Sequence, residues 1–208
     1  MSNQFEGMSD SEIIELYSNN PYTPLSCNFD YFGESLVIEL MKINGLWLEY
    51  VLEQTEAICE AAIRQHPGVL SYVRKQTEYL CKLAVTLEGF NLEYIRRQTP
   101  EMVAIALSVR PYALRYVHYQ TKQMCYDFIN IHPEALWVIK DQTYDLCYNA
   151  ILRNPHALEH VNTQVEVLCI VAVNIDGLAL QHVRYQTQEI IDTALRQNPE
   201  AAKFINTY

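Results

Sequence analysis

The stretch QTYDLCYNAILRNPHALEHV, residues 142–161, is one copy of a unit that returns every 22 residues. Its opening Gln-Thr pair recurs at this interval as Gln54-Thr55, Gln76-Thr77, Gln98-Thr99, Gln120-Thr121 and Gln186-Thr187. At Gln164-Val165 only the glutamine is kept. Eight such units fit between residues 32 and 208. Because a fixed period is typical of repeat arrays, the sequence predicts an eight-repeat solenoid over residues 32–208.

The apolar residues of each unit predict an α-helix. They stand three, four, seven and eight positions after the Thr, as in Leu146, Cys147, Ala150 and Ile151. This spacing forms one stripe of a helix and does not alternate as a strand does. The Thr itself is a favoured N-cap, because its hydroxyl accepts from the first-turn N–H groups.

A Pro or Gly, such as Pro155, ends this first helix at the same place in every unit. The following Leu158 and Val161 predict a second helix of about eight residues. Neither helix is long enough to be stable alone. We therefore predict an all-α fold, an α-solenoid of helix-turn-helix repeats that bury Ala, Cys and Leu between layers.

The repeated glutamine is expected to be structural. It lies in the joint between one repeat and the next, where backbone groups lack helical partners. A glutamine amide offers donors and an acceptor, so it can bond the joint and the next repeat as a ladder. A direct contact with a ligand is the alternative interpretation.

The two ends of the chain depart from the regular repeat. Residues 1–31 are predicted to form an N-terminal helical cap, and SDSE, Ser9 to Glu12, resembles a capping box that opens a helix through about Ser18. The last repeat presents Ala201, Ala202, Phe204 and Ile205. We expect this partly apolar end to be covered by a second copy of the protein or by a partner.

Composition and charge narrow the cellular setting. Half of the residues are apolar, and MSNQFEGMSDSE lacks the basic and apolar regions of a secretory signal. A membrane-spanning helix needs roughly 18 or more apolar residues in a row, and no stretch approaches that length. We therefore expect a cytoplasmic protein without a membrane-spanning segment.

Six cysteines raise the alternative of a metal site or disulfides. Five share one repeat position: Cys59, Cys81, Cys125, Cys147 and Cys169. Val37, Val103 and Ile191 fill that position in other repeats, which indicates a small buried apolar residue. No C-x-x-C spacing is present, so we predict free thiols in the core and no metal or cofactor.

HALEH, His156 to His160, formally fits the H-x-x-E-H motif of inverted zinc proteases. His160 occupies a repeat position that elsewhere holds Tyr50 or Tyr116, and Glu159 occupies a variable position. The repeat frame therefore favours structural roles, with a zinc-dependent hydrolase as a remote alternative.

The charge is unevenly distributed. Residues 1–63 carry 11 acidic and one basic side chain, whereas residues 64–122 carry 9 basic and 4 acidic ones, within a net charge of −10. The candidate partner-binding residues follow the second helices of three successive repeats: Arg74, Lys75, Arg96, Arg97, His118 and Tyr119. They predict a ridge that docks an acidic partner, although a solvated edge is the plainer interpretation.

The unit has the form QT-x-x-x-C-x-x-A-[IV]-x-x-x-[PG]-x-A-L-x-x-V. It resembles a short helical repeat, a domain family of unknown function, in giant DNA viruses, large phages and some intracellular bacteria. The resemblance covers residues 32–208 and leaves out residues 1–31. It implies an α-helical array and a viral or pathogen-side origin, and it brings no catalytic residue with it.

These patterns together predict a non-enzymatic scaffold that binds another protein. The resemblance suggests a viral or pathogen factor that binds a host or competitor protein in the host cytoplasm. A nucleic-acid-binding array is the main alternative, but the exposed positions vary without a code-like order and the net charge is −10.

Overall fold

The computed structural model describes residues 5, 7–20 and 29–206, and regular structure in these ranges is entirely helical, without a strand. Each repeat pairs a ten-residue α-helix with a shorter 3₁₀ helix. The α-helices are α2 (Glu34–Ile43), α3 (Glu56–Gln65), α4 (Glu78–Leu87), α5 (Pro100–Val109), α6 (Lys122–Ile131), α7 (Tyr144–Arg153), α8 (Glu166–Ile175) and α9 (Gln188–Gln197). The 3₁₀ helices are η2 (Gly45–Tyr50), η3 (Pro67–Tyr72), η4 (Gly89–Tyr94), η5 (Pro111–Tyr116), η6 (Pro133–Val138), η7 (Pro155–His160), η8 (Gly177–His182) and η9 (Pro199–Phe204). The predicted all-α repeat array is confirmed.

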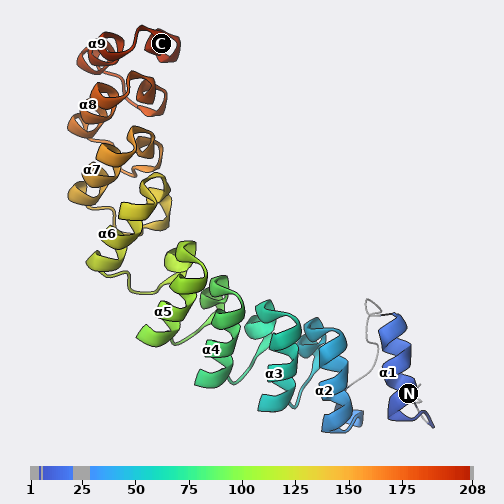
Figure 1. Cartoon of the computed structure of the whole chain (residues 1–208). Coiled ribbons are helices and arrows are strands. Elements are labelled where there is room, and N and C mark those ends of the chain that lie inside the picture. The colour runs from blue at the N-terminus through green and yellow to red at the C-terminus, as the bar shows by residue number, and fades with distance from the viewer. Residues whose placement is uncertain (1–4, 6, 21–28, 207–208) are drawn as a thin grey trace. The chain divides into compact units, whose positions relative to one another are not determined.

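The chain divides into two compact units, Met1–His118 and Tyr119–Tyr208. Within the first unit α2 to α5 lie side by side in chain order, and within the second α6 to α9 do the same (Figure 1). The predicted boundary between residues 31 and 32 stays a prediction.

The α-helices begin and end as the sequence predicts. The Thr143 hydroxyl accepts a hydrogen bond from the Leu146 N–H, 3.4 Å away, and thereby caps α7. The same cap is made by Thr55, Thr77, Thr99, Thr121 and Thr187. Val165 starts α8 without a side-chain cap, because valine has no hydroxyl. The last turn of α7 closes when Asn154 N–H donates to the Ala150 carbonyl.

The second helix of each repeat is shorter and tighter than predicted. Instead of about eight residues, it has six, in a 3₁₀ conformation. In η4 the chain leaves the helix at Ile95, whose backbone is extended at φ −78° and ψ 116° while its N–H still donates to Leu92. A segment this short, started by Gly or Pro, makes the i→i+3 bonds that suit brief helical pieces.

The core lies where the apolar stripe predicts it. Ala150 and Leu158 are fully buried, and Cys147 is 3% exposed. The small alanines allow close approach of successive repeats. A Cβ added to Gly45 would lie 2.4 Å from the Ala62 carbonyl oxygen of the next repeat, so only the glycine fits that contact as it stands.

The N-terminal helix α1 (Asp10–Asn19) covers the first repeat. Its capping box is confirmed, because Ser9 accepts from the Glu12 N–H and the Glu12 carboxylate accepts from the Ser9 N–H. Tyr17 is buried, and its ring meets the Trp47 ring of η2 edge-on at 5.2 Å.

The glutamine ladder is also confirmed. The Gln164 amide nitrogen donates to the carbonyls of Leu158 and His182, each at 2.8 Å, and its oxygen accepts from the Arg184 N–H at 2.9 Å. One side chain thus satisfies backbone groups of two successive repeats. Bonds from the joint to the following repeat recur at Gln54, Gln76, Gln98, Gln120, Gln142 and Gln186.

We predict that Gln164→Ala lowers the free energy of unfolding by about 2–4 kcal/mol, because the His182 carbonyl and the Arg184 N–H lose their partner and the Leu158 carbonyl keeps only the Val161 N–H. Gln181→Ala is the matched control, since Gln181 is exposed in η8 and its side chain makes no hydrogen bond within the described ranges. Urea denaturation measures both variants. Equal losses for the two would contradict the role given to the ladder.

Candidate functional site

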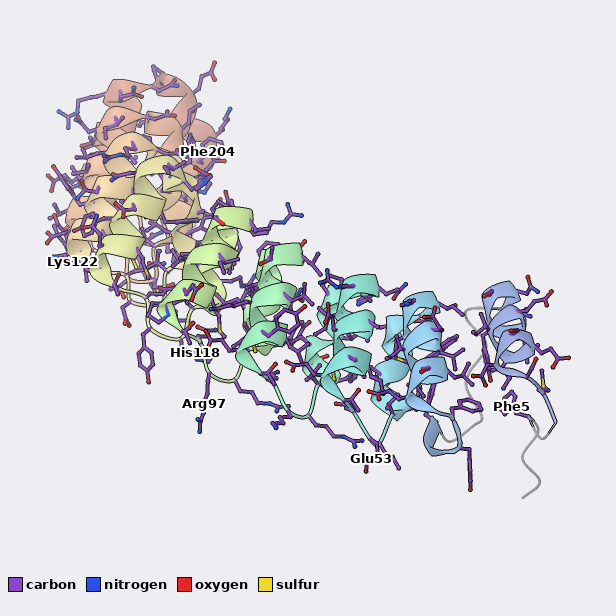
Figure 2. The ribbon with its side chains drawn as sticks, turned by 60° about the horizontal axis from the view of Figure 1, so that its bottom comes forward. Phe5, Glu53, Arg97, His118, Lys122 and Phe204 are labelled. Carbon is purple, nitrogen blue, oxygen red and sulfur yellow. The ribbon has the colours of Figure 1, made fainter. Side chains whose placement is uncertain are left out.

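The predicted partner-binding residues all lie in the joints that follow 3₁₀ helices, and all six are exposed. Five belong to the first unit, whereas Tyr119 is the first residue of the second unit. The labelled residues Glu53, Arg97 and His118 mark the loop edge of the first unit, where Arg97 points away from the ribbon (Figure 2). We call Arg74, Lys75, Arg96 and Arg97 the basic ridge.

Two arginines of the basic ridge are tied to the backbone of the preceding repeat. The Arg96 guanidinium donates to the Arg74 carbonyl at 2.8 Å and to the Val73 carbonyl at 3.2 Å. Arg74 makes the corresponding bond to Leu52. Arg184 repeats the arrangement in the second unit, with Asn162 as acceptor. An arginine at this position therefore connects repeats, a role that the charge pattern did not reveal.

Lys75 and Arg97 stand one position later and have no such tie. Within the described part of the chain, neither side chain makes an ion pair or a hydrogen bond. The nearby Glu78 is already paired, because Lys82 lies 2.7 Å from it and 2.6 Å from Glu101 of the next helix. Lys75 and Arg97 are thus the two cations of the basic ridge whose side chains are not bonded to another described residue.

A groove of about 380 Å³ opens beside Arg96 and Arg97. Its other walls include Gln76 of the ladder and Thr99, the N-cap of α5. The groove gives a partner's side chain room to approach Arg97 from the joint between two repeats.

The H-x-x-E-H residues are engaged in contacts between repeats. The His156 Nε2 atom lies 3.0 Å from the Asp176 carboxylate, and its Nδ1 atom lies 3.0 Å from the Nε2 atom of His182. Glu159 lies 3.8 Å from His182 rather than beside His156. Burial lowers the pKa of His182. In the ranges that the structure describes, no group of three or more His, Cys, Asp or Glu side chains has the arrangement of a metal site.

The five cysteines that share a repeat position are buried, as predicted, and none of these five is in a disulfide. Burial raises the pKa of the Cys59 and Cys169 thiols to about 11. A thiol with so high a pKa is a poor nucleophile near neutral pH, because the thiolate is the reactive form. The sixth cysteine, Cys27, lies outside the described residues.

No family model, curated protein or solved structure matches the chain. The resemblance to the viral and phage repeat therefore stays a prediction. Among the described residues, no helix combines the length and apolar character needed to cross a membrane.

We predict that Arg96→Met lowers the free energy of unfolding by about 1 kcal/mol, because it removes bonds to two carbonyls of the preceding repeat. Arg97→Met, with the same loss of charge, should leave stability nearly unchanged. Thermal and urea denaturation of the pair separates the two roles. A larger loss for Arg97→Met would show that the assignment of the two arginines is wrong.

We also expect slow alkylation of the buried thiols. At pH 8, a thiol with a pKa of about 11 has a thiolate fraction roughly 100-fold below that of an ordinary exposed cysteine. Cys59 and Cys169 should therefore react with iodoacetamide at least ~100-fold more slowly in the native protein than in the urea-unfolded protein. Peptide mass mapping follows each cysteine separately. Rapid native labelling of either residue would contradict its burial.

Proposed function

We propose that the protein is a non-enzymatic docking array whose basic ridge binds an acidic segment of a partner protein. The observation that carries this proposal is the pair Lys75 and Arg97. The two cations occupy the same position on successive repeats, are exposed, and have no counter-ion among the described residues. A partner's carboxylates would supply the missing charges.

The repeat architecture supports docking because it holds the ridge in place before binding. Arg96 ties its own joint to the preceding one, and Gln76 accepts from the Arg96 N–H at 3.0 Å. A backbone fixed in this way loses little conformational entropy when a partner binds, so the ordering cost falls on the Lys75 and Arg97 side chains. The resemblance adds the expectation that the partner is a host or competitor protein met by a viral or pathogen factor.

Nucleic acid is the second candidate. Tyr119 and Tyr185 stand at the repeat position of Lys75 and Arg97 and are 89% and 81% exposed, so their rings could stack on bases. The net charge of −10 opposes any polyanion, but a nucleic acid carries a phosphate at every nucleotide and needs a longer positive surface than the four cations of the basic ridge supply. The acidic-partner proposal needs only the local charge of the ridge.

A titration with labelled ligands tests the proposal. A fluorescent glutamate-rich peptide should bind at low salt, and Lys75→Glu with Arg97→Glu should weaken that binding at least ~10-fold, because the variant places carboxylates against carboxylates. Arg153→Glu with Lys203→Glu is the control of equal charge change, and its affinity should change far less.

Single-stranded RNA of equal charge separates the two candidate functions. The docking proposal expects the glutamate-rich peptide to bind more tightly than the RNA. Stronger binding of RNA, weakened by the same double substitution, would instead support a nucleic-acid function. Peptide binding that is identical for the ridge variant and its control would remove the ridge as the docking surface.

A further inference from the structure

A second groove of the first unit has a chemistry opposite to that of the basic ridge. It has a volume of about 380 Å³ and lies where η3 and η4 meet, with Gly68 on one side and Phe90 and Tyr94 on the other. That volume falls within the roughly 300–1,000 Å³ typical of ligand pockets. We call it the acceptor groove, because its polar side chains include Asn91, Glu88 and Glu93.

Asn91 is the unusual residue of the acceptor groove. It is only 3% exposed, although its repeat position is apolar in the other seven repeats: Trp47, Val69, Ala113, Ala135, Ala157, Ala179 and Ala201. Its Nδ2 atom donates to the Ala84 carbonyl at 3.1 Å, which fixes the orientation of the amide. Its Oδ1 atom accepts no hydrogen bond from any described residue.

No buried side-chain nitrogen or oxygen atom of the described residues lacks a hydrogen-bond partner, so the unbonded Asn91 Oδ1 atom is open to solvent. Water therefore supplies its donor in the free protein. Since Asn91 lines the groove, a ligand that carries N–H groups could supply the donor. Such a donor would replace water at an amide oxygen that accepts no hydrogen bond from a described residue.

The charge of the groove selects a cation. The Glu88 carboxylate is engaged by the Arg110 guanidinium at 3.1 and 3.2 Å. Glu93 is exposed and, within the described ranges, makes neither an ion pair nor a side-chain hydrogen bond. One uncompensated carboxylate therefore stands two residues from the unpartnered amide oxygen of Asn91.

The aromatic walls favour a guanidinium. Phe90 and Tyr94 are each 39% exposed, and aromatic faces attract cations. The next repeat contains the equivalent interaction within the chain, because the Arg115 guanidinium lies over the Tyr116 ring at 5.1 Å. Arg115 and Tyr116 match Glu93 and Tyr94 in the repeat. The third repeat thus has the Glu93 carboxylate where the next repeat has the Arg115 cation, and this leaves the Tyr94 ring available.

We propose that the acceptor groove binds an arginine side chain in an extended segment of a partner protein. Asn91 Oδ1 and the Glu93 carboxylate accept its N–H groups, and Tyr94 and Phe90 pack against the guanidinium plane. Arginine suits these walls better than lysine, because its planar group has several donors and stacks on rings. This site uses other residues than the basic ridge and binds the opposite charge, so it goes beyond the proposed function.

The test uses the full chain, isotope-labelled, and titrates it with N-acetyl-arginine amide as the probe. Proton–nitrogen correlation spectra should show saturable shifts at Gly68, Glu93 and the Asn91 side-chain amide. N-acetyl-citrulline amide, which has a similar shape without the charge, should bind at least ~10-fold more weakly, since the cation–π and carboxylate contacts need the charge.

Two substitutions locate the binding. Asn91→Ala and Glu93→Gln should each weaken arginine binding several-fold, and together at least ~10-fold. Alanine already occupies the position of Asn91 in five other repeats, so Asn91→Ala is expected to fold. Glu49→Gln is the matched control, because Glu49 has the position of Glu93 in a repeat without the asparagine.

The ridge variant Lys75→Glu with Arg97→Glu should retain arginine binding, which keeps the outcomes of the two proposals distinct. Equal binding of the citrulline probe, or shifts that persist in the Asn91→Ala and Glu93→Gln double variant, would overturn the assignment. So would the absence of saturable shifts in the groove.

Discussion

The repeated joint depends on one glutamine side chain. Short helices leave carbonyl and N–H groups at their ends without partners. A six-residue 3₁₀ helix makes too few other stabilising contacts to offset the free-energy cost of these unpaired groups. Gln142 supplies two donors to the carbonyls of Leu136 and His160 and one acceptor to the Asn162 N–H. Only an uncharged amide of this length offers both functions, and glutamate would set a carboxylate against the carbonyls. The ladder therefore requires both a glutamine in each joint and a constant spacing of 22 residues between joints.

Once the glutamine bonds fix the backbone of the joint, the residues at the variable repeat positions determine what the surface can bind. At a variable position the residue type differs from repeat to repeat, whereas the backbone stays the same. For example, Arg74 and Arg96 bond the preceding joint, and His118 occupies the same repeat position. The frame thus separates residues that maintain the stack from residues that are available to a partner. Lys75, Arg97 and Glu93 belong to the second kind, because no described residue bonds their charged groups.

The fold could be predicted from the sequence because the same pattern of residues occurs in each repeat. The α-helix bounds, the threonine caps and the glutamine ladder follow from residues that recur at the same repeat position. Because the pattern recurs, an ambiguous residue in one repeat does not change the prediction. The 3₁₀ form of the second helix could not be predicted, since Leu158 and Val161 fit one turn of either helix type. The bonds of Arg96 depend on distances between repeats, and the unbonded oxygen of Asn91 depends on how its amide is oriented by the Ala84 carbonyl within the same repeat. Only the apolar residues found elsewhere at the position of Asn91 could have drawn attention to it.

The 3₁₀ geometry also explains how one repeat can present opposite charges. Glu93 and Arg97 are four residues apart, a spacing at which acid and base pair on the surface of an α-helix. Had the second helix continued as predicted, the two would neutralise each other. Instead η4 ends at Tyr94 and the extended backbone of Ile95 intervenes, and no ion pair joins Glu93 to Arg97 in the described structure. The early end of the helix thus leaves a carboxylate in the acceptor groove and a guanidinium on the basic ridge, both available to partners.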